Sequence, residues 1–444
     1  MNREGENGGM TIILMNWYRQ YGSVYVLWML FNPVVILSHP DMAKKALITL
    51  NLPKSPRLYS KLSSVFGQRA AGQGIMTEID HDVWRHKRAM LEPGFHRKYL
   101  MNSMDAFNSI CDDFLENLRK YADGKTPVRM MDEFERVTLD IIGKVGFGIN
   151  LNNVGNPDSA FPSAVSKTLE GMQANLQNPF WMFQISSFPF QNSVVEAIRY
   201  LRYFAKNVIE ERSLALHNGD ETPNDILQHI VKEAQENSEI EMDDLVDNFF
   251  TIFIAGQETT SSQLSFTLYE ILRHPRIEER ILKEVDEVLG HREAVEYEDL
   301  GQLQYLDQTL KEALRKYPPV ATAHRILQKE DIFGGYKIPA KTPVGVSCFN
   351  IHNSPEFWES PEDFDPDRFS TSGKVPTMHC AYFPFFLGPR TCIGKTLAQF
   401  EAKVVISRVL REFKFEILPG QTGQVKEKML LRPQDGVICT LTQR

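Results

Sequence analysis

The amino-acid sequence predicts a mainly α-helical protein with small β-sheets, which is the α+β class. Apolar residues recur at three- and four-residue spacing over most of the chain from about Ser103 to Lys316, the pattern of helices that bury one face. Stretches rich in β-branched and aromatic residues, typical of strands, lie before and after this region. The chain has 444 residues and no flexible linker, so we expect a single large domain over residues 1–444.

Charge and cysteine content exclude several classes of protein. The net charge of -8 argues against a nucleic-acid-binding protein, which normally carries a basic surface. The five cysteines are odd in number and widely spaced, with no CxxC pair, so neither a disulfide framework nor a zinc site is expected. A reducing compartment fits this cysteine usage best.

The N-terminal region predicts a pair of strands rather than a membrane span. The stretch VYVLWMLFNPVVILSHP is apolar from Val24 to Phe31 and is then broken by Asn32 and Pro33. It therefore falls short of the roughly 20 apolar residues that a spanning helix needs. Its β-branched and aromatic residues around an Asn-Pro turn are typical of two strands, and we expect no segment of this chain to cross a bilayer.

Two later segments of the helical region carry unusual side chains. The stretch NPFWMFQISSFPFQ, residues 178–191, is rich in Phe and Pro and is expected either to pack inside or to form a membrane-facing or substrate-entry lip. Residues 243–274 predict one helix about 45 Å long, ended by Pro275. Polar residues 256–260 interrupt its apolar pattern, as a solvent-facing turn or as a place for a ligand or water.

The stretch KEALRKYPP places Glu312 and Arg315 three residues apart on one helix face, where the two side chains can pair. Leu310, Ala313 and Leu314 lie on the opposite side, so the pattern by itself indicates an ordinary surface ion pair. Strand patterns return in GGYKIPAKTPVGVSCF and in the C-terminal GVICTLTQR.

Cys392 lies just before a helix that the periodicity predicts from Lys395 onward. Free backbone N–H groups and the helix dipole at such a position favour a thiolate. Three interpretations of the cysteine stay open from these residues: a buried structural thiol, a nucleophile, and an axial ligand of a metal cofactor. The nucleophile also needs a base, and none lies nearby in the sequence.

The spacing around Cys392 resembles a known motif. Phe385, Gly388, Arg390, Cys392 and Gly394 form F-x-x-G-x-R-x-C-x-G, and this segment resembles the haem-binding loop of the cytochrome P450 family. The resemblance implies that Cys392 is the thiolate ligand of iron in haem b, iron-protoporphyrin IX, and assists O–O cleavage. It further implies that Phe385 packs beside the sulfur, that the glycines let the loop bend under the macrocycle, and that Arg390 reaches a propionate.

The resemblance implies the cytochrome P450 fold, a helical bundle around a buried haem with a long central helix on its distal side. Trp84 and Arg88 match the W-x-x-x-R that contacts haem propionates in this family. Arg325 is expected to be a third propionate partner, with a surface arginine as the alternative. Glu312, Arg315 and Arg368 then form a structural charge cluster rather than a catalytic one.

Residues 255–259 resemble the A-G-x-[D/E]-T oxygen-activation motif of the family. The resemblance gives the catalytic roles to Thr259, which would hold dioxygen and a water by hydrogen bonds, and to Glu258, which would help to relay protons. Thr260 is the neighbour and not the key hydroxyl. Gln257 replaces the histidine that we expect before the acidic residue.

The implied activity is that of a haem-thiolate monooxygenase acting on a hydrophobic small molecule with O2. Residues 59–88, 249–271, 284–319 and 426–441 are most similar to the cholesterol 24-hydroxylases within the family, which implies hydroxylation of a sterol side chain. Another lipid, a fatty acid or a xenobiotic is the alternative substrate. A haem-thiolate isomerase and a non-catalytic haem or sterol carrier are further alternatives.

The resemblance also implies a redox partner and a location. Electrons would come from NADPH through NADPH-cytochrome P450 reductase, and basic residues 85–88 and 96–98 together with Lys395 and Lys403 could form its docking face. Scattered solvated charge is the alternative. The chain starts almost at its first amphipathic segment, without the membrane anchor of such proteins, so we expect peripheral association with the cytoplasmic face of the endoplasmic reticulum membrane.

Overall fold

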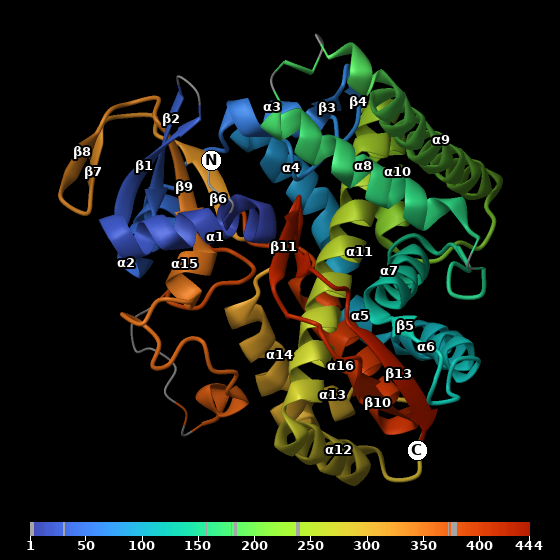
Figure 1. The fold of residues 1–444 in the computed structure, drawn as a ribbon. Coiled ribbons are helices and arrows are strands. Elements are labelled where there is room, and N and C mark those ends of the chain that lie inside the picture. Colours follow the sequence, from blue (N-terminus) through green and yellow to red (C-terminus); the bar gives the residue numbers. More distant parts are fainter. Residues whose placement is uncertain are drawn as a thin grey trace.

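The computed structural model describes residues 4–29, 32–156, 158–178, 180–181, 184–236, 240–371, 373 and 380–444. Helices dominate this part of the chain (Figure 1). The longer helices are α1 Glu4–Tyr21, α3 Pro56–Ser63, α4 His81–Leu91, α6 Met104–Arg119, α7 Met130–Ile141, α8 Ala160–Gln177, α9 Phe188–Asn218, α10 Ile226–Glu236, α11 Met242–Arg273, α12 Pro275–Leu289, α14 Gln304–Lys316 and α16 Lys395–Glu412.

Short elements connect these helices and form small sheets. The short helical elements are α2 Pro40–Lys44, η1 Lys45–Thr49, η2 Glu92–Phe95, α5 Arg97–Met101, η3 Ile142–Gly146, η5 Ile185–Ser187, α13 Asp299–Gln302, α15 Cys348–His352 and η6 Pro366–Phe369. The strands are β1 Val24–Met29, β2 Asn32–Leu37, β3 Ser64–Val65, β4 Gln68–Arg69, β5 Val128–Arg129, β6 Thr322–Ile326, β7 Asp331–Phe333, β8 Tyr336–Ile338, β9 Pro343–Ser347, β10 Phe413–Ile417, β11 Val425–Lys428, β12 Leu430–Pro433 and β13 Ile438–Gln443. The predicted α+β class is therefore confirmed.

Helix α11 runs through the centre of the molecule, between the sheet of β1, β2, β6 and β9 and the helices α6 to α10 (Figure 1). It spans 32 residues and agrees within one residue at each end with the predicted helix. Pro275 occupies the first turn of α12, where a proline needs no N–H partner, so the chain turns there. Helices α7, α9, α14 and α16 all pack against α11.

The N-terminal strand pair is present as predicted. β1 and β2 are antiparallel, with Val24 opposite Leu37, and β2 continues into a four-stranded sheet in the order β1-β2-β9-β6. Within the described ranges, no helix combines the length and the apolar character required to cross a bilayer.

The late strand predictions are correct for β8, β9 and β13 but too long at one end. The strand pattern reached Phe349, whereas β9 ends at Ser347. The Ser347 hydroxyl accepts a hydrogen bond from the Asn350 N–H and caps α15, so the chain turns helical at Cys348. Strand β5, inside the region predicted as helical, pairs with β13 from the other end of the chain, a contact that no local pattern encodes.

The main hydrophobic core extends from Leu62 to Leu441 in the sequence. Helix α16 begins at Lys395, as the periodicity predicted, and its buried face joins this core. The loop that precedes α16 carries Cys392 and leads directly into this packed helix.

Candidate active site

The loop at residues 384–394 carries Cys392, and we call it the cysteine loop. Its own backbone closes it. The Cys392 N–H donates to the Phe385 carbonyl at 2.9 Å, and the Thr391 N–H donates to the Gly388 carbonyl at 3.1 Å. Gly388 has φ +76°, and a Cβ there would lie 2.0 Å from the Leu47 carbonyl oxygen. Only glycine fits this close approach, so the predicted need for Gly388 has a structural reason within the chain.

Phe385 and Gly394 flank Cys392 in the sequence of the loop. The Phe385 ring lies 5.9 Å from Lys395 Nζ. A Cβ on Gly394 would lie 3.9 Å from Cys392 Sγ and 3.8 Å from the Phe95 ring, both ordinary contacts. The roles predicted for these residues toward a cofactor stay predictions.

The Cys392 side chain is exposed. Burial of the thiol group nevertheless raises its pKa, whereas the Gly394 N–H and the charges of Arg88 and Lys395 lower the pKa by smaller amounts. This combination is typical of a side chain that borders an internal space. The Gly394 N–H lowers the thiol pKa, the direction expected at a helix N-terminus, but burial has the larger effect. A thiol with a raised pKa is a poor free nucleophile, and metal coordination is what would deprotonate it.

Helix α11 is almost entirely buried but opens at one point. Ala255 is exposed and Gly256 and Thr259 are partly exposed, although the helix lies at the centre of the molecule (Figure 1). The Thr259 hydroxyl donates to the Ala255 carbonyl at 2.8 Å. We call Ala255, Gly256 and Thr259 the accessible strip. The solvent-facing-turn alternative is excluded for Gln257, Glu258 and Thr260, which are each 2% exposed.

Glu258 makes an ion pair inside the protein. Its carboxylate contacts the guanidinium of Arg432 on β12, and Arg432 also pairs with Glu135 of α7 at 3.4 Å. Gln257, at the departure from the family pattern, has a buried side-chain oxygen that accepts no hydrogen bond from the described residues. Sequence analysis did not identify Arg432 as the partner of Glu258, because Arg432 is 174 residues away and lies on a strand.

Trp84, Arg88 and Arg390 meet next to the cysteine loop. Arg88 donates to the Thr391 carbonyl at 2.8 Å, one residue before Cys392. The Arg390 guanidinium lies 4.4 Å from the Trp84 ring centre and donates to the Glu78 carbonyl at 2.8 Å. The W-x-x-x-R pattern and the arginine of the cysteine motif, about three hundred residues apart, thus share one site.

The site contains more buried positive charge than the surrounding carboxylates match. Burial, with the charge of Arg325, lowers the pKa of Arg390 to about 10. Burial and the charges of Arg390 and Arg325 lower the pKa of Lys54 well below its usual value. Arg325 is 4% exposed, which excludes the surface-arginine alternative. A ligand with two carboxylates, such as the propionates of haem, fits this set of donors.

Glu312, Arg315 and Arg368 form a buried cluster. Arg315 binds Glu312 through two bonds of 2.8 and 2.9 Å, and Arg368 Nε donates to Glu312 at 3.3 Å. Glu312 and Arg315 are both fully buried. The prediction of a surface ion pair is therefore wrong. Elements α15 and η6 cover the polar face of α14, and the apolar face of α14 packs on α11 and α16.

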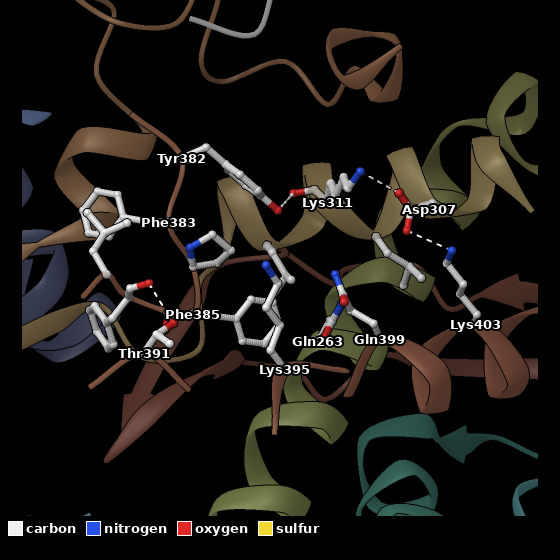
Figure 2. Close-up of a pocket in the computed structure, with 15 residues that line it drawn as sticks. Gln263, Asp307, Lys311, Tyr382, Phe383, Phe385, Thr391, Lys395, Gln399 and Lys403 are labelled. Atoms are coloured by element: carbon white, nitrogen blue, oxygen red, sulfur yellow. Dashed lines mark hydrogen bonds and ion pairs between the residues drawn. The ribbon is translucent and has the colours of Figure 1, made fainter. Parts of the chain in front are cut away.

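A pocket of about 190 Å³ lies between α14, α16 and the cysteine loop, and Figure 2 shows the residues that line it. Asp307 bridges Lys311 at 2.7 Å and Lys403 at 2.9 Å on one wall, and Phe385 and Lys395 lie on another. Lys403 is thereby engaged internally, and Lys87 is buried against Glu78 at 3.0 Å. We expected both lysines on the docking face, but their ammonium groups are engaged with Glu78 and Asp307. The other basic residues of that face, Arg85, His96, Arg97, Lys98 and Lys395, are exposed.

The aromatic stretch at residues 178–191 divides between the two alternatives. Trp181 and Phe190 pack edge-on against Phe66, 5.2 and 6.2 Å between ring centres. Phe180 and Phe188 are 58% and 41% exposed. Pro179, Met182 and Phe183 lie outside the described residues.

The chain was compared with known proteins. The family model for cytochrome P450 matches residues 4–440. Cytochrome P450 4d2 of Drosophila melanogaster is 30% identical over 96% of this chain and 87% of its own length. Cytochrome P450 3A28 of Bos taurus is 29% identical over 96% and 85%, and cytochrome P450 3A5 of Homo sapiens is 28% identical over 96% and 86%.

Proposed function

Because this chain belongs to the cytochrome P450 family of haem-dependent monooxygenases, we propose that Cys392 is the ligand of the haem iron in a single catalytic domain, residues 1–444. The observation that carries the proposal is the cysteine loop with its surplus of buried cations. When bound, the haem supplies activation of O2 with electrons from a redox partner. Arg88, Arg325 and Arg390 hold its propionates, Trp84 lies under Arg390, and Phe385, Gly388 and Gly394 shape the loop around the sulfur.

We assign the proton chemistry to α11. The Thr259 hydroxyl lies on the accessible strip and can turn from the Ala255 carbonyl to donate a proton there. Glu258 is the adjacent acid, and its carboxylate is bound by Arg432. Within the described part of the chain, no hydrogen bond or ion pair joins Glu312, Arg315 or Arg368 to the strip or to Cys392. These three residues act as a scaffold for α14 and the loop region that covers it.

The substrate that we propose is a hydrophobic lipid, with a sterol side chain as the favoured group. The resemblance of four long segments to cholesterol 24-hydroxylases supports the sterol, whereas the names of the compared relatives specify no substrate. NADPH-cytochrome P450 reductase is the proposed electron donor, with exposed Arg85, Arg97, Lys98 and Lys395 available to an acidic partner. Exposed Trp28 and Phe180 suit peripheral association with the endoplasmic reticulum membrane on its cytoplasmic face.

Two variants test the site. Reduced protein under carbon monoxide should show the red-shifted Soret band of a thiolate-ligated haem, and Cys392→Ala should abolish the band whereas Cys380→Ala keeps it.

Thr259→Ala should keep the band but lower the product formed per NADPH by about tenfold or more, with the electrons appearing as peroxide. Thr260→Ala, which removes the neighbouring buried hydroxyl, is the matched control. A Cys392→Ala protein with an unchanged band would contradict the ligand assignment.

Product analysis separates the functional alternatives. Mass spectrometry after turnover with cholesterol, fatty acids and other lipids should show a gain of one oxygen that requires both reductase and NADPH. Rearrangement of a peroxide without NADPH would instead indicate an isomerase. Haem and sterol binding with no product, in the presence of active reductase, would indicate a carrier.

A further inference from the structure

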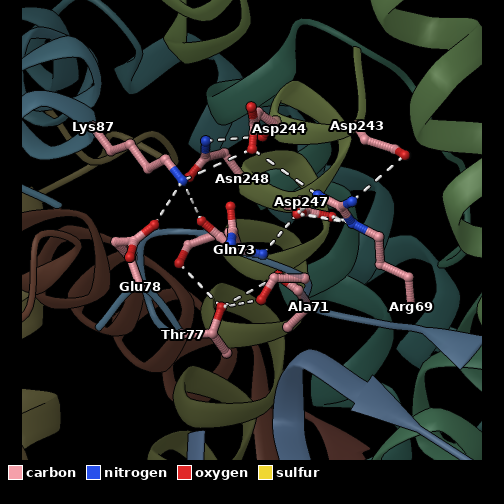
Figure 3. Close-up of polar contacts among 12 residues, drawn as sticks. Arg69, Ala71, Gln73, Thr77, Glu78, Lys87, Asp243, Asp244, Asp247 and Asn248 are labelled. Atoms are coloured by element: carbon pink, nitrogen blue, oxygen red, sulfur yellow. Dashed lines mark hydrogen bonds and ion pairs between the residues drawn. The ribbon is translucent and has the colours of Figure 1, made fainter. Parts of the chain in front are cut away.

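A buried carboxylate on α11 binds two arginines from distant parts of the chain. Asp247 is fully buried. It accepts a bond of 2.7 Å from Arg69 Nη2 and one of 2.6 Å from Arg202 Nη1. Figure 3 shows Arg69 beside Asp247, with Asp243 beyond it and Lys87 and Glu78 on the other side. We call Arg69, Asp247 and Arg202 the clasp.

The clasp also holds the backbone of residues 69–80, which we call the cover segment. Asp247 accepts the Gln73 N–H at 2.7 Å, and Arg202 donates to the Ala70 carbonyl at 3.0 Å. Gly72 has φ +47°, and a Cβ there would lie 1.9 Å from a carboxylate oxygen of Asp247. The segment therefore lies directly on the carboxylate, at a distance that a larger residue does not permit.

Further bonds fix the middle of the cover segment. The Ile75 N–H donates to the Asn248 side chain at 2.9 Å, and the Lys87 ammonium donates to the Gln73 carbonyl at 2.6 Å (Figure 3). The Thr77 hydroxyl donates to the Gly72 carbonyl at 2.9 Å, a bond within the segment itself.

The cover segment connects the two sides of the candidate active site. Asp247, Thr251, Ala255 and Thr259 follow each other at four-residue spacing, so each residue lies beside the next along a row that winds slowly around α11. The segment lies on the first two of these residues, because a Cβ on Gly74 would meet both Thr251 Oγ1 and the Asp247 carbonyl. Its other end accepts Arg390 of the cysteine loop at the Glu78 carbonyl. The cover segment thus connects the turn of α11 next to the accessible strip with Arg390 of the cysteine loop.

We propose that Asp247 is a positioning residue that holds the cover segment closed beside the accessible strip, and that release of the clasp sets the rate at which a hydrophobic ligand enters and leaves. The proposal rests on the proposed function for its ligand, but not for the motion of the segment. Arg69 is the releasable partner, because its side chain is 40% exposed and it also faces Asp243 at 3.6 Å and Asp244 at 4.0 Å. Arg202 is only 10% exposed and stays with Asp247.

The experiment compares Asp247→Asn with Asp243→Asn in the haem-loaded full chain. Both carboxylates lie on α11 one turn apart and both contact Arg69 and Arg202, but Asp243 is half-exposed and, among the described residues, accepts no bond from the backbone of the cover segment. Amide hydrogen exchange is followed by mass spectrometry in residues 70–78 and in residues 262–271 of α11. Binding of 4-phenylimidazole, an apolar nitrogen ligand, is followed by stopped-flow at the Soret band.

Asp247→Asn should speed exchange in residues 70–78 by roughly tenfold or more without changing residues 262–271, and should raise both the association and dissociation rates of 4-phenylimidazole several-fold. Asp243→Asn should change each quantity by less than about twofold. Arg69→Gln, at an exposed position, provides a second variant with the same direction of effect. Unchanged exchange in residues 70–78, or an equal rise in residues 262–271, overturns the proposal. Exchange needs no turnover, so it is read independently of the oxidation chemistry.

Discussion

Two buried carboxylates of the molecule bind the same kinds of partner in different surroundings. Glu312 on α14 accepts bonds from Arg315 and Arg368 and from the Asp365 N–H at 3.0 Å. Asp247 on α11 accepts bonds from Arg69 and Arg202 and from the Gln73 N–H at 2.7 Å. Each acid is fully buried, and each is bound by two guanidinium groups and one backbone amide.

The remaining guanidinium donors distinguish the two clusters. Arg315 gives its other donors to the carbonyls of His352 and Pro361, both at 2.8 Å, and its side chain is fully buried. Arg69 instead faces Asp243, whose side chain is 57% exposed. Water and salt reach one side of the Asp247 clasp but not the Glu312 cluster, so the same ion-pair chemistry builds a permanent scaffold in one place and a releasable contact in the other.

The largest expected effect comes from breaking the scaffold. Glu312→Gln leaves two buried guanidinium groups without their charge partner, and we expect it to lower the free energy of unfolding by about 3–5 kcal/mol. Denaturant unfolding followed by circular dichroism measures the change. Glu362→Gln is the matched control, because Glu362 pairs with Arg19 at 3.0 Å on the surface, and it should have an effect close to zero. Equal effects of the two variants would contradict the difference that we draw from burial.

Low pH should lower the free energy of unfolding through His352, which lies beside the Glu312 cluster. The carbonyl of His352 receives Arg315, and its Nε2 accepts the Phe383 N–H at 2.9 Å. Burial, with the charge of Arg315, lowers the pKa of His352 to about 3, against about 6.5 in an unfolded chain. Between these two values the unfolded chain binds one proton more than the folded chain, so stability falls as the pH drops below 6.5.

This residue should account for about 2 kcal/mol of stability lost between pH 7 and pH 5. The measurement is denaturant unfolding at both pH values for the natural chain and for His352→Gln, whose amide oxygen can still accept the Phe383 N–H. The variant should show a smaller loss on acidification. His324, whose pKa burial lowers to about 4, remains in both proteins and gives the background slope. An unchanged slope in His352→Gln would assign the acid sensitivity to other groups.

The two clusters differ in how far the sequence predicts them. The pattern around Glu312 and Arg315 indicated an exposed helix face, and only the family resemblance joined Arg368 to them as a structural group. The pattern was misleading because α15 and η6, contributed by later parts of the chain, cover that face. Asp247 was not singled out at all, since its acidic neighbours in DDLVDNFF are typical of a helix start and Arg69 is 178 residues away.

Local patterns predicted the features that depend on local physics. The apolar repeat and Pro275 predicted the ends of α11 within one residue, and Cys392 was correctly expected just before α16. The pairing of Glu258 with Arg432 and the gathering of Lys54, Arg325 and Arg390 depend on how strands and loops pack together. Such contacts join residues with no common periodicity, so a single sequence carries no signal for them.

The smallest expected effect, and the most direct test of the comparison, is the response to salt. An exposed ion pair loses most of its attraction when the Debye length falls from about 10 Å at 0.1 M to about 3 Å at 1 M, whereas a buried pair is hardly screened. Raising sodium chloride over this range should therefore speed amide exchange in residues 70–78 by a few-fold, which corresponds to less than about 1 kcal/mol. Exchange in residues 312–316, where the side chains of Glu312 and Arg315 are fully buried, should stay constant. Arg69→Gln, which lacks the screened link, should lose the salt response in residues 70–78. A salt response of the same size in both regions would mean that exposure of Arg69 does not make the clasp releasable, and that Asp247 and Glu312 are scaffolds of one kind.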